Sequence, residues 1–270
     1  MKKLLLVILF IMLAGTAIFY GNSQYKNKLS LTNERAQAEI SRYQEESEEQ
    51  VLQKEMEEQE RLERLVGNVS PELEEKIMQV LAGGEPLKVV AMGSRALTGK
   101  GDLVPWPEII EERVNKLYGI NLFNVETLAF GKDNTFDVVG GDKHLEAALL
   151  NPDIVILEPF IWNNNGYARM EDTLYHIGEM VRVFKEENED VIIFIQPGNP
   201  IYNATLFQQQ VASVKEYSLE QGLLYFDHWE KWPDTSDEIL KSYLIEDDDI
   251  PNQSGHDLWA DYLVRYFVAE

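Results

Sequence analysis

The hydrophobic residues of this chain follow three successive patterns. Leu4 to Tyr20 is a continuous apolar run without a charged residue. From Asn33 to Val66, Glu, Gln and Arg dominate and no Pro or Gly interrupts them, which predicts a charged helix. From Leu87 onward, short apolar runs alternate with stretches of helical periodicity. The pattern predicts an N-terminal membrane segment (1–22), a charged helical stalk (23–69) and a globular domain (70–270).

The N-terminal apolar run is at the lower edge of the length of a membrane span and longer than the usual apolar core of a signal peptide. Gly15 and Ala17 offer only a weak cleavage site, and the charged stalk follows directly. We therefore favour an uncleaved anchor over a cleaved signal. Lys2 and Lys3 are expected to stay in the cytoplasm, which places the rest of the chain outside the cell.

The apolar positions of the stalk, between Ile40 and Leu65, do not keep a heptad repeat. A solvated helix that holds the next domain away from the membrane is the simpler interpretation. A coiled coil is the second interpretation.

Beyond the stalk, the pattern indicates an α/β domain. Ser70 can cap a helix that Pro71 opens. Further helices are expected over 107–118, 136–150, 170–186, 207–221 and 255–268, and strands over 87–92, 121–128, 154–157, 191–195 and 223–226. Uninterrupted apolar strands that alternate with helices predict a parallel sheet covered on both faces. Ligands of such folds bind in the loops beyond the carboxyl ends of the strands.

The composition excludes several classes of function. The net charge of −23 argues against binding to nucleic acid or to anionic lipid headgroups. The favoured interpretation of this negative charge is that it keeps the protein soluble. The chain has no cysteine, so disulfides, thiolate nucleophiles and cysteine-based zinc sites are excluded. Gly99-Lys100-Gly101 lacks the spacing of a phosphate loop. No cofactor is expected.

Three segments carry a resemblance to a known family. They are Asn151 to Asn165, Tyr225 to Trp229, and Pro251 to His256. From Lys88 to the C-terminus, about two-thirds of its length, the chain resembles the SGNH (GDSL) hydrolases, and within them a membrane-anchored branch from Gram-positive bacteria. The resemblance implies a three-layer α/β/α fold of flavodoxin-like type. It also implies ester hydrolysis by a serine after the first strand and an Asp-x-x-His before the last helix.

The family pattern matches this chain in part. The resemblance assigns Gly131 and Asn163 to the oxyanion hole, where preorganised donors bind the tetrahedral intermediate. Where the family has Gly-Asp-Ser-Leu, the chain has Gly93-Ser94-Arg95-Ala96, so Ser94 is at the aspartate place and Arg95 is at the serine place.

The second half of the family's triad is also altered. Asp247 keeps the place of the acid before the last helix, whereas Ile250 replaces the histidine. Two members of the triad have therefore changed together, which is typical of an inactivated or rewired site.

A rewired site would use Ser94 as a displaced nucleophile, assisted by His256 or Asp247. The other interpretation of His256 is packing or capping at the start of the last helix. His228 is expected in a loop or in a pocket wall, and His144 and His176 inside helices at the surface or in the core.

Two weaker signals complete the candidates. The carboxylates from Glu246 to Asp249 can hold a hard cation such as calcium, although a solvated acidic turn is the simpler interpretation. Aromatic residues are candidates to line a sugar-binding groove, with core packing favoured for Trp106 and Trp259; the candidates are Trp106, Trp162, Trp229, Trp232 and Tyr202.

The sequence therefore leaves three hypotheses. The first is an esterase acting on acylated small molecules or polysaccharides, such as O-acetyl groups of the cell envelope. The second is a catalytically inactive SGNH-like protein that binds an envelope glycan or a protein partner. The third is a scaffold whose stalk self-associates.

Overall fold

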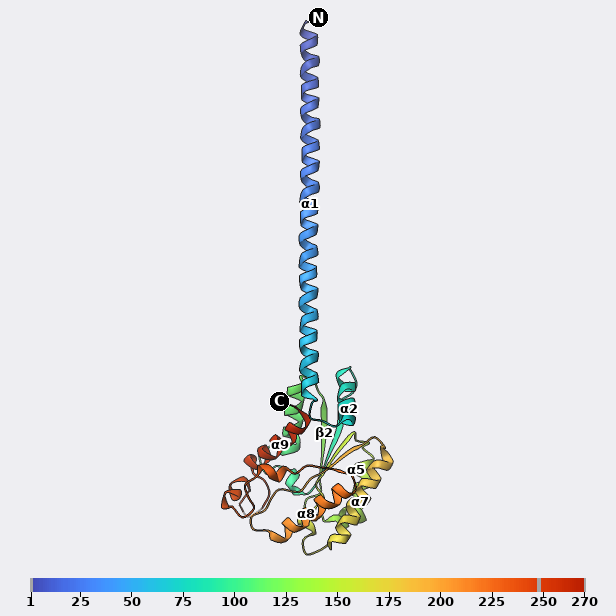
Figure 1. Ribbon diagram of the computed structural model, residues 1–270, viewed down its shortest axis with the longest axis vertical. Helices are drawn as coiled ribbons and strands as arrows, with labels where there is room; N and C mark the ends of the chain where they lie inside the picture. The colour runs from blue at the N-terminus through green and yellow to red at the C-terminus, as the bar shows by residue number, and fades with distance from the viewer. Residues whose placement is uncertain (1, 247–248, 270) are drawn as a thin grey trace. The chain divides into compact units, whose positions relative to one another are not determined.

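The computed structural model describes residues 2–246 and 249–269, which form two compact units, Met1–Arg61 and Leu62–Glu270 (Figure 1). Helix α1 (Lys2–Leu65) contains the apolar run and the charged stalk without a break. In the described part of the chain, α1 is the one helix that is long and apolar enough to cross a membrane. Its length and composition fit a membrane anchor or a signal sequence.

The apolar side chains of α1 are exposed along both of its parts. Phe19 in the N-terminal run is 79% exposed, and Ile40 and Val51 in the charged part are also exposed. Leu62 and Leu65, at the end of the helix, pack against the core of the second unit, ahead of the expected domain start at residue 70. The coiled coil stays a prediction.

The second unit is built on a five-stranded parallel sheet with the strand order β2-β1-β3-β4-β5. The strands are β1 (Leu87–Gly93), β2 (Phe123–Ala129), β3 (Ile154–Leu157), β4 (Ile192–Ile195) and β5 (Leu224–Tyr225). Every residue of β3 and β4 is buried, as expected for parallel strands covered on both faces. The predicted α/β sheet is confirmed.

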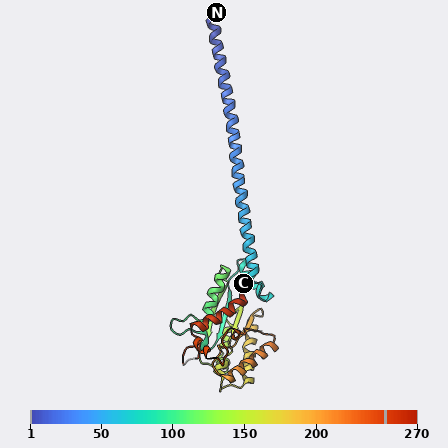
Figure 2. The ribbon, with the colours of Figure 1, turned by 60° about the vertical axis from the view of Figure 1, so that its left-hand side comes forward.

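Helices cover both faces of the sheet. On one face lie α2 (Pro71–Leu81), α3 (Trp106–Tyr118) and α9 (Gln253–Phe267), whose apolar residues share one core. Figure 2 shows α3 and α9 side by side, and they contact each other extensively. On the other face lie α4 (Thr135–Gly140), α5 (Lys143–Ala148), α7 (Met170–Glu187) and α8 (Thr205–Glu220).

Short helices follow several strands and position the loops. They are η1 (Arg95–Leu97), α6 (Ile161–Asn164), η2 (His228–Lys231) and η3 (Glu238–Tyr243). The expected helix over 136–150 is wrong, because two helices, α4 and α5, occupy this stretch. Gly140 and Gly141 end α4, and Asp142 takes a left-handed conformation with φ of 58°. The two glycines therefore end α4, and the left-handed Asp142 changes the direction of the chain before α5.

Candidate functional site

The loops after β1, β2 and β3 meet at the carbonyl oxygen of Gly131. This oxygen accepts hydrogen bonds from the Arg95 N–H at 3.0 Å and from the Asn163 side-chain amide at 3.0 Å. The Phe130 N–H donates to the Gly93 carbonyl at 2.9 Å and joins the first two loops again. Parallel strands bring their carboxyl ends to one edge, so segments far apart in sequence form one site.

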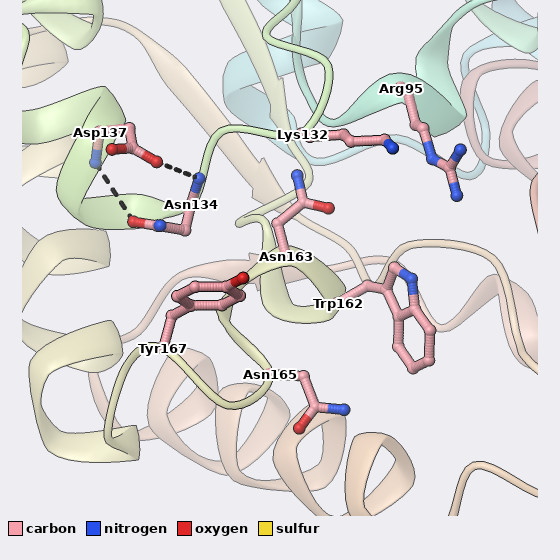
Figure 3. Close-up of a pocket in the computed structure, with 8 residues that line it drawn as sticks. All are labelled: Arg95, Lys132, Asn134, Asp137, Trp162, Asn163, Asn165 and Tyr167. Carbon is pink, nitrogen blue, oxygen red and sulfur yellow. Dashed lines mark hydrogen bonds between the residues drawn. The ribbon is translucent and has the colours of Figure 1, made fainter.

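A cleft of about 540 Å³ opens at this edge of the sheet (Figure 3). Its lining comes from the loops after β1, β2 and β3 and consists of Arg95, Lys132, Asn134, Asp137, Trp162, Asn163, Asn165 and Tyr167. Arg95, at the serine place of the family motif, lines the cleft, whereas Ser94 does not belong to the lining.

Ser94 is buried, with 5% of its surface exposed. Its hydroxyl oxygen accepts a hydrogen bond from the Ala96 N–H at 3.3 Å and caps the short helix η1. Its own N–H donates to the Glu158 carboxylate at 2.6 Å. A serine at a helix N-cap satisfies backbone donors that otherwise have no partner. Ser94 is therefore engaged in holding the loop after β1.

Glu158, directly after β3, is a fully buried acid to which the sequence analysis gave no role. A Cβ atom at Gly93 would lie 2.7 Å from the Glu158 Cβ, and a Cβ atom at Gly198 would lie 3.3 Å from its Oε1. The carboxylate thus occupies space that these two glycines leave open. Burial raises the pKa of Glu158, and hydrogen bonds from the Ser94 side chain and N–H oppose that rise. The sign of this buried acid in the sequence was its position directly after a wholly apolar strand.

The Asn163 side chain, expected in an oxyanion hole, is bound to the neighbouring loop. Its amide nitrogen donates to the carbonyl oxygens of Gly131 at 3.0 Å and of Asp133 at 2.8 Å. An amide NH₂ has two hydrogens, so both are used by these carbonyls. Gly131 itself takes a left-handed conformation with φ of 60°. In this arrangement Asn163 fixes the loop after β2 and forms part of the cleft wall.

His256 is fully buried at the start of α9. Its Nδ1 accepts a hydrogen bond from the Trp106 N–H at 3.3 Å, which assigns the proton of the neutral ring to Nε2. Burial lowers the pKa of His256 to about 4. No hydrogen bond joins His256 and Ser94, both of which the structure describes. Ile250 is buried, and Asp247 lies outside the described residues.

The remaining histidines are interior residues. His228 donates from Nε2 to the Pro197 carbonyl, accepts from the Trp232 indole and stacks on Trp259 at 4.1 Å. Burial lowers the pKa of His228 to about 3. His144 and His176 are buried in the helical layer. His228 is therefore a satisfied core residue.

Among the aromatic candidates, Trp162 lines the cleft. Trp106 is buried and stacks on Trp259 at 5.2 Å, as core packing requires. Trp229 and Trp232 line a separate cavity of about 420 Å³. Tyr202 lies under the Lys241 ammonium group at 4.1 Å.

The described residues contain no cluster of three acidic or histidine side chains that could hold a metal ion. In the acidic segment from Glu246 to Asp249, expected as an alternative cation site, Asp247 and Asp248 lie outside the described residues.

Comparison of the sequence with protein-family models and with curated proteins gives no match. Solved structures are similar to the chain over its globular unit. A GDSL-family lipolytic protein from Desulfitobacterium hafniense is 19% identical with a TM-score of 0.54, and the match covers 67% of this chain and 99% of that protein. The chain has the SGNH hydrolase fold.

Two further structures with the SGNH fold belong to proteins named for ester hydrolysis. An acetylxylan esterase from Geobacillus stearothermophilus is 14% identical with a TM-score of 0.55, over 68% of this chain and 95% of the esterase. A GDSL-like lipase from Parabacteroides merdae is 10% identical with a TM-score of 0.56, over 68% and 96%. At these identities the likeness concerns the fold.

Proposed function

We propose that this SGNH-fold protein binds its ligand in the cleft lined by Arg95 and does not hydrolyse an ester there. The observation that carries the proposal is that an arginine, and not a serine, lines the cleft after β1. Arg95 lines the cleft, while the Ser94 hydroxyl is buried and caps η1. An arginine binds anions and polar groups but does not attack a carbonyl carbon.

The partners that acyl transfer needs are engaged elsewhere. A serine requires a base within hydrogen-bond reach, and its oxyanion requires donors that are free to bind it. His256 accepts a hydrogen bond from a backbone N–H, and the Asn163 amide donates to two backbone carbonyls.

The cleft suits a polar, hydroxylated ligand. Its walls combine the side-chain amide of Asn165 and the NH₂ group of Asn134, whose oxygen caps α4, with the aromatic rings of Trp162 and Tyr167. Amides and hydroxyls hydrogen-bond to sugar hydroxyls, and aromatic rings offer flat apolar surface to sugar rings. We infer that the ligand is a carbohydrate of the cell envelope.

The experiment measures ester hydrolysis and covalent labelling. The full chain in detergent micelles is incubated with p-nitrophenyl acetate, acetylated xylan and a fluorophosphonate probe, beside Ser94→Ala and Arg95→Ser variants. We expect no labelling of the wild type and equal background hydrolysis by wild type and Ser94→Ala. Labelling of the wild type that disappears in Ser94→Ala would overturn the proposal.

A second candidate is a hydrolase of acyl esters, such as O-acetyl groups of an envelope polysaccharide. The observation in its favour is the hydrogen bonding between Ser94 and Glu158, because a carboxylate within hydrogen-bond reach of a serine can accept its proton. In this scheme Ser94 attacks after a shift of its loop, with His256 or Asp247 assisting and Gly131 and Asn163 binding the oxyanion. The same labelling experiment decides between the candidates.

We also propose that the apolar run at the start of α1 stays in the cell membrane as a single span, with the globular unit outside. The apolar exposure of this run and Lys2 and Lys3 ahead of it support this orientation. Digestion of the globular unit by protease added to intact cells tests it. Protection until the cells are lysed would contradict the orientation.

A further inference from the structure

Exposed apolar side chains of α1 recur every eleven residues. The four that set this period are Ile18, Leu29, Ile40 and Val51, and each of them is exposed. Eleven residues make three turns of a helix with about 3.67 residues per turn, so these side chains lie on one side of α1. The stalk keeps no heptad because its repeat is longer than seven residues.

The positions between these residues complete a stripe without charge. We define the α1 stripe as Leu29, Thr32, Ala36, Ile40, Tyr43, Ser47 and Val51, in steps of three, four and four residues. Such steps keep the residues of a helix on one face. Glutamates dominate the same part of the chain but none lies on the stripe, and α1 runs through it without a break (Figure 1). The stripe is therefore a face of its own on an otherwise charged helix.

A groove in the surface of α1 lies on this stripe. Its lining consists of Ile40, Tyr43, Gln44, Ser47 and Glu48. The first four are residues i, i+3, i+4 and i+7 of the helix, which form the hole that receives one side chain of the facing helix in a coiled coil. Tyr43 of a second copy, aligned in the same direction and register, lies at the height of this hole. The groove thus fits a helix that carries the same stripe.

A second copy of this chain presents that stripe in the required direction. Two copies anchored by the N-terminal apolar run start their stalks at the same membrane surface and run the same way. Confinement to one membrane also raises their effective concentration. Pairing of the two stripes removes apolar side chains such as Ile40 and Val51 from water.

We propose that the α1 stripe binds the same stripe of a second copy in a parallel, in-register pair. An eleven-residue repeat gives the pair a right-handed supercoil. The pairing does not involve the cleft, and it rests on the proposed membrane span only for its parallel direction.

Disulfide cross-linking tests the register, because the chain has no cysteine of its own. Full chains with Leu29→Cys, Ile40→Cys or Val51→Cys are oxidised in detergent micelles and separated on a non-reducing gel. We expect linked dimers from all three, since a disulfide needs Cα atoms within about 7 Å and only a parallel, in-register pair brings each position beside its own copy. Glu49→Cys is the matched control and should stay monomeric, because nine residues from Ile40 are two and a half helical turns.

Sedimentation equilibrium of the cysteine-free chain in micelles is the second measurement. The wild type should have the mass of two chains, and the double variant Ile40→Glu with Val51→Glu the mass of one. Glutamate favours helix but places like charges opposite each other in the pair. Far-UV circular dichroism checks that the helix is kept.

Several results would overturn the pairing. They are a monomeric wild type, a double variant that stays dimeric, and linkage of Glu49→Cys as efficient as that of Ile40→Cys. Linkage at only one of the three stripe positions would indicate an antiparallel pair and overturn the register. Micelles impose no direction, so these results do not depend on the membrane span, which the protease experiment on intact cells tests separately.

Discussion

Ser94 and Glu158 are joined by a hydrogen bond from the Ser94 N–H to the Glu158 carboxylate at 2.6 Å. The bond ties the loop after β1 to the end of β3 beneath the cleft. In the family motif an aspartate is expected at position 94, whereas here the buried acid comes from the neighbouring strand. Ser94 thus stands where the family has an aspartate, and Glu158 supplies a buried acid in the same region. The Glu158 carboxylate holds the loop that carries Arg95.

The first prediction concerns Glu158→Gln. Burial raises the pKa of Glu158, so the folded protein holds this proton more tightly than the unfolded chain does. The contribution of Glu158 to stability is then fully present at low pH and is lost as the pH rises through its raised pKa. Glutamine keeps an acceptor for the Ser94 N–H without a charge. Relative to the wild type, the variant should gain stability as the pH rises.

Thermal unfolding of wild type and Glu158→Gln from pH 4 to pH 8 measures this difference. Glu146→Gln, on the exposed surface of α5, is the control for the removal of one carboxylate. A Glu158→Gln variant that loses stability relative to the wild type as the pH rises would show that the buried carboxylate is well satisfied when ionised.

The second prediction concerns the space between β1 and Glu158. In Gly93→Ala, the new methyl group would lie 2.7 Å from the Glu158 Cβ and 2.8 Å from a Leu97 methyl group. Such overpacking costs roughly 1–3 kcal/mol or more. Gly140→Ala, in α4 with no atom within 4 Å of the added methyl group, should instead stabilise the protein by up to about 1 kcal/mol. Urea denaturation of both variants compares the two, and equal stabilities would refute the packing argument.

The sequence allowed most of the sheet to be predicted, because the strands are buried on both faces. Ile154–Leu157 is an apolar run of four residues and matches β3 at both ends. The break between α4 and α5 was missed because helical periodicity continues across it. The break depends on Gly140 and Gly141, which are visible in the sequence, and on the left-handed backbone of Asp142, which is not.

For the site, the sequence allowed the loops to be identified but not the contacts of their side chains. Ser94 and Arg95 are adjacent, and which of them lines the cleft depends on the capping of η1 by the Ser94 hydroxyl. Likewise, Asn163 is close to Gly131, but its amide donates to the carbonyl of that loop. Hydrogen bonds of this kind depend on backbone positions that only the folded chain defines.

The third prediction concerns Asn163→Asp. The two carbonyl oxygens that accept from the Asn163 amide would then face a carboxylate, which has no hydrogen to donate. Loss of both bonds and the repulsion that follows should destabilise the globular unit by roughly 2–4 kcal/mol. Asn165→Asp, in the same cleft wall, is the matched control and should change stability by less than about 1 kcal/mol. Unchanged stability of Asn163→Asp in thermal denaturation would mean that the amide is free to bind an oxyanion.

The last prediction concerns the role of His256 and the stability of the domain in acid. Burial lowers the pKa of His256 to about 4, below the ordinary value of 6.5. The folded state therefore binds this proton more weakly than the unfolded chain. The stabilising contribution is fully present above pH 6.5 and is lost as the pH falls toward 4, by up to about 3 kcal/mol.

In His256→Asn, the side-chain oxygen can accept the Trp106 N–H in place of Nδ1 without titrating. The variant should lose less stability than the wild type between pH 6.5 and pH 4, by calorimetric unfolding. Titration of the imidazole by NMR gives the pKa directly. A general base has its pKa near the operating pH, so a measured pKa near 7 would return His256 to the candidates for catalysis, whereas a pKa near 4 identifies a histidine of the core.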